Sequence, residues 1–83
     1  MYYLYILYSD IAGKYYVGSS ESPGDRLRKH NAKHKGFTGP ADDWKIVYTE
    51  VYSTKQQALQ REKQIKSWKS KKITEALIKG SAG

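Results

Sequence analysis

Residues 2–8 read Tyr-Tyr-Leu-Tyr-Ile-Leu-Tyr, and this stretch decides the fold. It is uncharged and consists of aromatic and aliphatic residues, a composition typical of a β-strand. A turn follows at residues 10–14, where Gly13 can supply a positive φ angle. Residues 15–20 return to the β pattern, so we predict that the chain opens with a β-hairpin.

A helix start follows the hairpin. Ser22 can act as the N-cap, Pro23 suits the first helical position, and Asp25 places an acid in the first turn. We expect this helix to run to about Lys33. Residues 35–43 are dense in glycine and proline and predict a loop.

The second half of the chain predicts one strand and two helices. Residues 44–52 alternate well enough for a third strand. Ser53 or Thr54 can cap a helix that reaches about residue 68, and Ser70 can cap a last helix.

The predicted order is therefore β-β-α-β-α-α, an α/β domain of the α+β type in which helices cover one sheet. We expect a single domain over residues 1–79 and a disordered tail at residues 80–83. The length of 83 residues suits one modest core, to which eight tyrosines and two tryptophans are candidates.

Charge points to a polyanionic partner. The net charge is +7, from 15 Lys and Arg against 8 Asp and Glu. Nucleic acid is the favoured partner, although basic surfaces also occur on ribosome-associated and membrane-surface proteins. Cysteine is absent, which excludes disulfides and thiolate metal sites. No apolar run could span a membrane and no charged leader is present, so we expect a cytoplasmic monomer without a small-molecule cofactor.

The alternation of side chains along a strand gives the hairpin two faces. One pairing buries Leu4, Ile6 and Val17 in the core. Tyr3, Tyr5 and Tyr16 would then line a partly open face, beside the bare backbone of Gly18. Ordinary amphipathic sheet residues would give the same pattern, because strands favour tyrosine.

The first helix presents a basic surface. Arg26 and His30 are four residues apart and share a face, while Lys29 and Lys33 form a neighbouring row. Such a surface suits phosphate, although a single histidine on a basic helix is often simply exposed.

Glu62 is the anomaly of the second long helix. It lies on the apolar stripe formed by Ala58 and Ile65, where an acid is costly unless it is paired. Two readings follow: a salt bridge to a lysine or arginine, or a carboxylate at a cleft edge that holds a hard divalent cation. Several lysines nearby could follow a phosphate backbone, above all Lys63, Lys66 and Lys69.

Four elements in order resemble the GIY-YIG endonuclease family. Tyr3-Leu4-Tyr5 and Tyr16-Val17-Gly18 look like the two halves of its signature, and the stretch around Arg26 and His30 is similar to that of many members. The segment around Glu62 resembles the one that carries the metal-binding glutamate. The resemblance covers residues 2–79 and is closest to the small stand-alone branch related to the nuclease domain of bacterial excision repair.

The resemblance implies a three-stranded antiparallel sheet and hydrolysis of DNA phosphodiester bonds with one Mg²⁺ or Mn²⁺. Tyr16 would be the general base or would orient the attacking water, and Tyr5 would position water or phosphate. Arg26 would stabilise charge on the phosphoryl oxygens, His30 would assist Tyr16, and Glu62 would hold the metal.

Two departures from the family pattern keep other functions open. Tyr3 stands where the family has glycine, and the asparagine that some branches use near the metal has no counterpart after Glu62. A nucleic-acid-binding module with weak or no catalysis, and an accessory partner in a repair complex, are therefore the alternatives to an endonuclease.

Overall fold

The computed structural model describes residues 1–31 and 42–82. The strands are β1 (Tyr2–Ser9), β2 (Lys14–Ser20) and β3 (Lys45–Tyr52), and the helices are α1 (Pro23–Asn31), α2 (Lys55–Trp68) and α3 (Lys71–Ala82). They follow one another in the predicted order. The strands form one antiparallel sheet, which confirms the predicted fold class.

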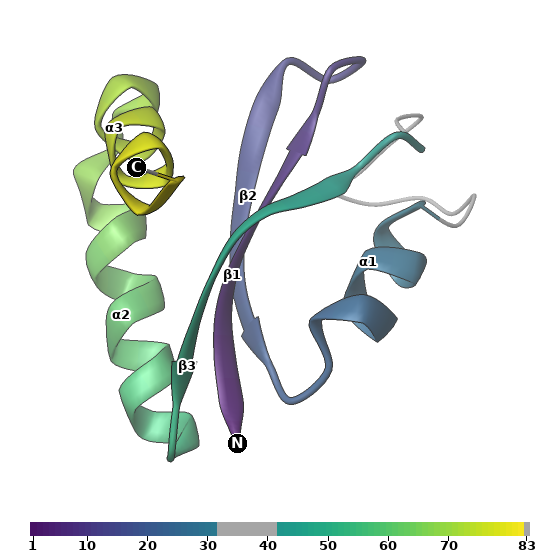
Figure 1. The fold of residues 1–83 in the computed structure, drawn as a ribbon. Coiled ribbons are helices and arrows are strands. Elements are labelled where there is room, and N and C mark those ends of the chain that lie inside the picture. The colour runs from purple at the N-terminus through teal and green to yellow at the C-terminus, as the bar shows by residue number, and fades with distance from the viewer. Residues whose placement is uncertain (32–41, 83) are drawn as a thin grey trace.

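The strand that decides the fold lies in the middle of the sheet. The strand order is β2-β1-β3, so β1 pairs with a neighbour along both edges. Helices α2 and α3 lie on one face of the sheet and α1 lies on the other (Figure 1). Four consecutive residues of β1, Leu4 to Leu7, are therefore at most 2% exposed. A strand covered on both faces has no position for a charge, which explains its composition.

The face under α2 holds the larger core cluster. Leu4, Ile6 and Val17 are buried there together with Ile65 of α2, as the alternation predicted. Ala58, one helical turn before Glu62, is completely buried on the same helix. The apolar stripe of α2 is therefore the surface that fixes this helix to the sheet.

The opposite face is closed rather than partly open, which corrects the expectation for Tyr5. Tyr5 is 2% exposed and packs with the fully buried Leu7 and with Trp44, and Leu27 of α1 covers them. The alternation of β1 predicted the face but not the helix on top of it. The other two tyrosines expected on this face, Tyr3 and Tyr16, remain partly exposed.

Side-chain caps begin helices α2 and α3, and a left-handed residue ends α2. Thr54 accepts a hydrogen bond from the backbone N–H of Gln57 at 3.3 Å, and Ser70 Oγ accepts one from Ile73 at 3.3 Å. Between them Lys69 adopts a left-handed conformation, with φ at 48°, and ends α2. The predicted caps at Thr54 and Ser70 are confirmed.

Three boundaries need comment. Helix α1 begins at Pro23 as predicted, whereas Lys33 and residues 35–41 of the predicted loop lie outside the described residues. Helix α3 continues to Ala82, so residues 80–82 are helical where we expected a tail. Among the helices of the described part, none is long and apolar enough to cross a membrane.

Candidate functional site

Two tyrosines meet over a glycine at the hairpin. Tyr5 and Gly18 are direct partners in the β1–β2 ladder. A Cβ atom placed on Gly18 would lie 2.6 Å from the hydroxyl oxygen of Tyr5 and 3.1 Å from Cε1 of Tyr16. Glycine is therefore required here for close approach, because any side chain would displace one of the two rings.

The hydroxyl of Tyr5 is held in its protonated form. Burial, and after it Tyr16 and Glu62, raise its pKa to about 12 against the positive charge of Arg26, which lowers it. Tyr5 therefore serves as a hydrogen-bond donor at neutral pH and not as a base. The same electrostatic contacts bring Tyr5, Tyr16, Arg26 and Glu62 into one neighbourhood, although they come from four different elements.

His30 joins this neighbourhood from the last turn of α1. Its ring lies 4.4 Å from that of Tyr16, centroid to centroid, and 6.0 Å from that of Trp44. The next residue, Asn31, donates to the Trp44 carbonyl at 2.9 Å and accepts from the Trp44 N–H at 2.7 Å. This amide therefore ties the end of α1 to the start of β3 and sets the position of His30. The sequence assigned Asn31 no role.

Glu62 approaches the site from α2. Its side chain is 17% exposed, and its Oε1 accepts a hydrogen bond from the Ser19 hydroxyl at 2.7 Å. Its Oε2 accepts one from the ammonium of Lys66 at 2.7 Å. The salt bridge that we weighed from the sequence is therefore present. It lies beside the tyrosines, because Lys66 Nζ is 5.9 Å from the ring centroid of Tyr16.

Two surface hollows border the outer strand β2. The first, about 530 Å³, includes Tyr16 and Lys66 among its lining residues. The second, about 430 Å³, includes Ser19, Arg26 and Lys29. They border consecutive stretches of β2, and of the residues predicted for chemistry Tyr16 lines the first and Arg26 lines the second.

The lysines predicted to bind nucleic acid divide between these recesses. Lys66 and Lys69 line the first and Lys29 lines the second, whereas Lys63 lines neither. Lys33 lies outside the described residues. Lys71, from the same lysine-rich segment, and Lys14, which no local pattern sets apart, also line the first hollow.

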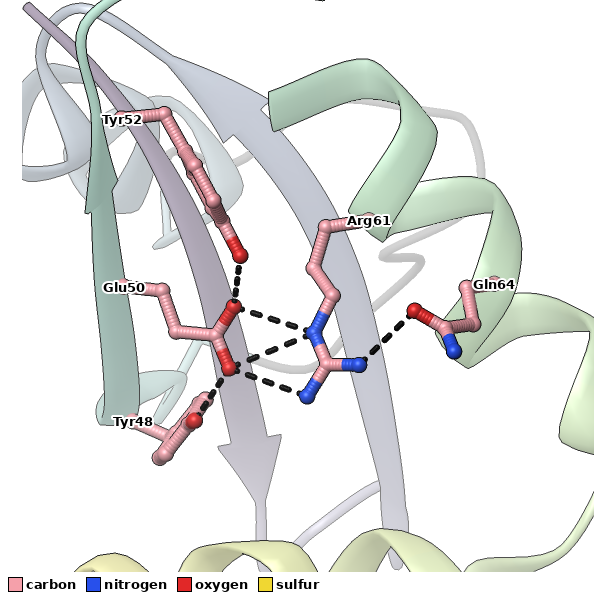
Figure 2. Close-up of polar contacts among 5 residues, drawn as sticks. All are labelled: Tyr48, Glu50, Tyr52, Arg61 and Gln64. Carbon is pink, nitrogen blue, oxygen red and sulfur yellow. Dashed lines mark hydrogen bonds and ion pairs between the residues drawn. The ribbon is translucent and has the colours of Figure 1, made fainter. Parts of the chain in front are cut away.

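A second carboxylate in the described structure escaped the sequence analysis. Figure 2 shows Glu50 of β3 facing Arg61 of α2, with Tyr48 and Tyr52 on either side of it. Arg61 donates to both oxygens of Glu50 at 3.0 to 3.3 Å, and both tyrosine hydroxyls donate to them as well. Burial acts to raise the pKa of Glu50, but these hydrogen bonds outweigh it and hold that pKa below its ordinary value.

The donor set for a metal is small. Across residues 1–31 and 42–82, no three His, Cys, Asp or Glu side chains gather as potential ligands. Glu62 is the carboxylate beside the tyrosines, and it already faces one cation in the ammonium of Lys66. One carboxylate fits Mg²⁺, which keeps several waters and binds substrate phosphate, and fits less well a metal that needs an all-protein cage.

Comparison with known proteins gives one positive result. The family model described as "GIY-YIG catalytic domain" matches residues 1–75. No curated protein and no solved structure matches the chain. The matched range contains Tyr5, Tyr16 and the whole of α2.

Proposed function

The chain belongs to the GIY-YIG family of nucleases, and from that membership we propose that it is a metal-dependent endonuclease that hydrolyses DNA phosphodiester bonds. The observation that carries the proposal is the meeting of Tyr5, Tyr16 and Glu62 around Gly18 and Ser19, at the open edge of the sheet. The net charge of +7 favours a nucleic acid as the substrate. We further propose that it belongs to the branch related to the excision-repair nuclease and acts in DNA repair or recombination.

The hydroxyl groups of the two tyrosines have different tasks in this proposal. Tyr16 takes a proton from the attacking water or orients that water, and His30, whose tilted ring lies beside that of Tyr16, assists the transfer. Tyr5 keeps its own proton, since its pKa is about 12, and donates a hydrogen bond to water or to a phosphoryl oxygen. The assignment follows from burial, because Tyr5 is covered by α1 while Tyr16 borders a hollow.

Two side chains from helices on opposite faces of the sheet counter the negative charge of the phosphate, Arg26 directly and Glu62 through a metal ion. Arg26 borders the second hollow and can donate two parallel hydrogen bonds to phosphoryl oxygens. Glu62 holds Mg²⁺ or Mn²⁺, which when bound supplies positive charge against the charge that develops on the phosphate oxygens. The fit rests on Oε2 of Glu62, which binds an ammonium at 2.7 Å and is therefore oriented toward a cation.

The decisive experiment is nicking of supercoiled plasmid. Wild-type protein with Mg²⁺ or Mn²⁺ is expected to produce the nicked form, and EDTA is expected to abolish it. Tyr16→Phe should lower the rate by about 10²-fold or more, the range of general-base catalysis. Tyr15→Phe is the matched control, because it removes only the hydroxyl of the neighbouring tyrosine on the opposite face of β2 and keeps its apolar ring.

Two results would favour the alternatives. Protein that retards DNA in a gel but cuts no form of it would be a binding module of this fold. Protein that does neither at low salt would be an accessory partner. Equal loss of nicking in Tyr16→Phe and Tyr15→Phe would remove Tyr16 from the chemistry.

A further inference from the structure

The first hollow has a chemical character of its own. It lies between the start of β2, the end of α2 and the start of α3, and its volume is about 530 Å³. Four of its lining residues are lysines that come from three separate segments of the chain: Lys14, Lys66, Lys69 and Lys71. Such a convergence concentrates positive charge at one recess rather than spreading it over the surface.

Local structure holds these lysines in place. The left-handed turn at Lys69 ends α2 and lets α3 begin beside the hairpin. Lys71 Nζ donates to the carbonyl of Gly13 at 3.3 Å and lies 5.9 Å from the ring centroid of Tyr8. Because these contacts already restrict the side chain, less conformational entropy is lost when it meets an anion.

The floor of the hollow is apolar. Tyr15, Val17 and Ile65 line it beneath the lysines. Glu75 lies near Tyr15, where burial first and then this carboxylate raise the tyrosine pKa. Two acids, Glu75 and Glu62, therefore lie near these four lysines, and Glu62 is paired with Lys66. An anion with an apolar body therefore suits the recess better than a free inorganic ion does.

We propose that this hollow binds the sugar–phosphate backbone of the nucleic-acid strand to one side of the phosphate that is cleaved. The inference rests on the proposed function, because Tyr16 lines the same hollow and so places it beside the reaction. The lysines contact phosphate oxygens, and the apolar floor lies against a sugar or a base.

The second hollow continues the path of this strand. Arg26, Lys29 and Lys55 line it beside Ser19 and Ser20 at the other end of β2, together with the acids Glu21 and Asp25, of which Asp25 is paired with Arg28. The seven residues of β2 span about 20 Å, or roughly six base steps of a duplex. A single short segment of DNA along this edge therefore reaches both hollows, with the tyrosines between them.

The test removes two charges from the hollow and compares them with two charges removed elsewhere. Lys14→Gln combined with Lys71→Gln alters the hollow, and Lys72→Gln combined with Lys79→Gln alters exposed lysines of α3 that do not line it. Binding of a fluorescent duplex is measured by anisotropy in EDTA, over a range of salt concentrations. EDTA separates binding from cleavage.

The hollow variant should bind at least about tenfold more weakly at low salt. Its plot of log K against log salt should be shallower by about 1.8, since two phosphate contacts contribute about 0.9 each. The control pair should change affinity by about twofold or less. Circular dichroism and thermal unfolding of both pairs verify that each remains folded.

Equal weakening in the two pairs would overturn the proposal, because diffuse charge would then explain binding. Equally strong binding of polyglutamate to the wild type would also overturn it, in favour of an acidic protein partner. Plasmid nicking by the wild type is scored separately. If the wild type nicks plasmid but the hollow variant loses no more DNA affinity than the control pair, the hollow is rejected and the endonuclease proposal stands. If the hollow variant alone loses DNA affinity but the wild type does not nick plasmid, the hollow stands and the endonuclease proposal is rejected.

Discussion

Two carboxylates, Glu50 of β3 and Glu62 of α2, are equally shielded from solvent but have different partners. The exposed fractions of their side chains are 18% and 17%. Glu50 is held by Arg61, whose side chain is only 23% exposed, and by two tyrosine hydroxyls. Glu62 is held by one serine hydroxyl and by Lys66, which is 52% exposed.

The comparison shows that burial alone does not identify a functional acid. The guanidinium of Arg61 forms a fork on Glu50 (Figure 2). It also lies 5.6 Å from the ring centroid of Trp68, so its position is fixed on two sides. Lys66 is a flexible point charge at the rim of a hollow. Glu50 is therefore a closed structural acid, whereas Glu62 can exchange its cation without disturbing the core.

The largest expected difference between these acids is in cleavage. Glu62→Gln should reduce plasmid nicking by about 10³-fold, because a neutral amide is a poor ligand for Mg²⁺ and loses several kcal/mol of charge stabilisation. Glu50→Gln is the matched change and should leave the rate per folded molecule within about threefold. If both folded variants lost nicking activity to a similar extent, Glu50 and Glu62 would not differ in function.

Removing the partner of Glu50 should cost more folding stability than removing the partner of Glu62. Arg61→Met leaves the shielded charge of Glu50 with two hydroxyls alone and should lower the free energy of unfolding by about 2–4 kcal/mol. Lys66→Met removes a half-exposed pair between residues four apart and should cost about 0.5 kcal/mol or less. Urea unfolding at pH 7 measures both. A large cost for Lys66→Met would mean that Glu62 is a structural acid as well.

The sequence drew attention to Glu62 and missed Glu50 for a physical reason. Glu62 interrupts a helical stripe whose period is visible within α2, so its conflict with burial appears in a short window of sequence. Glu50 follows Tyr48 and precedes Tyr52 on an ordinary alternating strand, where every second residue is commonly polar. Its shielding depends on Arg61 reaching over from α2, a contact between segments that no local pattern specifies.

The same limit applies elsewhere in the site. Alternation along β1 and β2 correctly predicted that Leu4, Ile6 and Val17 are buried together. It could not predict that α1 closes the other face over Tyr5, because the distance at which a helix packs depends on side chains such as Leu27 and Trp44. Three lysines around the first hollow, Lys66, Lys69 and Lys71, are close in sequence, whereas Lys14 reaches it only because the hairpin lies beside the start of α3.

A smaller effect separates the acids by pH. The pKa of Glu50 is lower in the folded chain than its ordinary value of 4.5. Its contribution to stability is therefore fully present above about pH 4.5 and is lost as the pH falls through the lower folded pKa. The stability difference between wild type and Glu50→Gln should narrow below that point.

Urea unfolding between pH 3 and pH 7 measures this change. The hydrogen bond from Ser9 also lowers the pKa of Asp43, but that group is common to both proteins and cancels in the difference. If the difference in free energy of unfolding between wild type and Glu50→Gln stayed constant from pH 3 to pH 7, the hydrogen bonds of Glu50 would not depend on its charge.

The smallest expected effect tests how firmly Lys66 holds Glu62. A half-exposed pair of residues four apart is worth about 0.5 kcal/mol, which is close to a twofold change in an equilibrium constant. If the ammonium competes with a divalent ion for Oε2, Lys66→Gln should strengthen Mn²⁺ binding by about that factor.

Titration calorimetry without DNA is the measurement, because Lys66 also lines the hollow proposed for the nucleic-acid strand. Lys63→Gln, an exposed change on the same helix, is the control for general loss of charge. Weaker Mn²⁺ binding in Lys66→Gln alone would mean that Lys66 orients the carboxylate for the metal instead of competing with it, and Glu62 would then depend on its lysine as closely as Glu50 depends on Arg61.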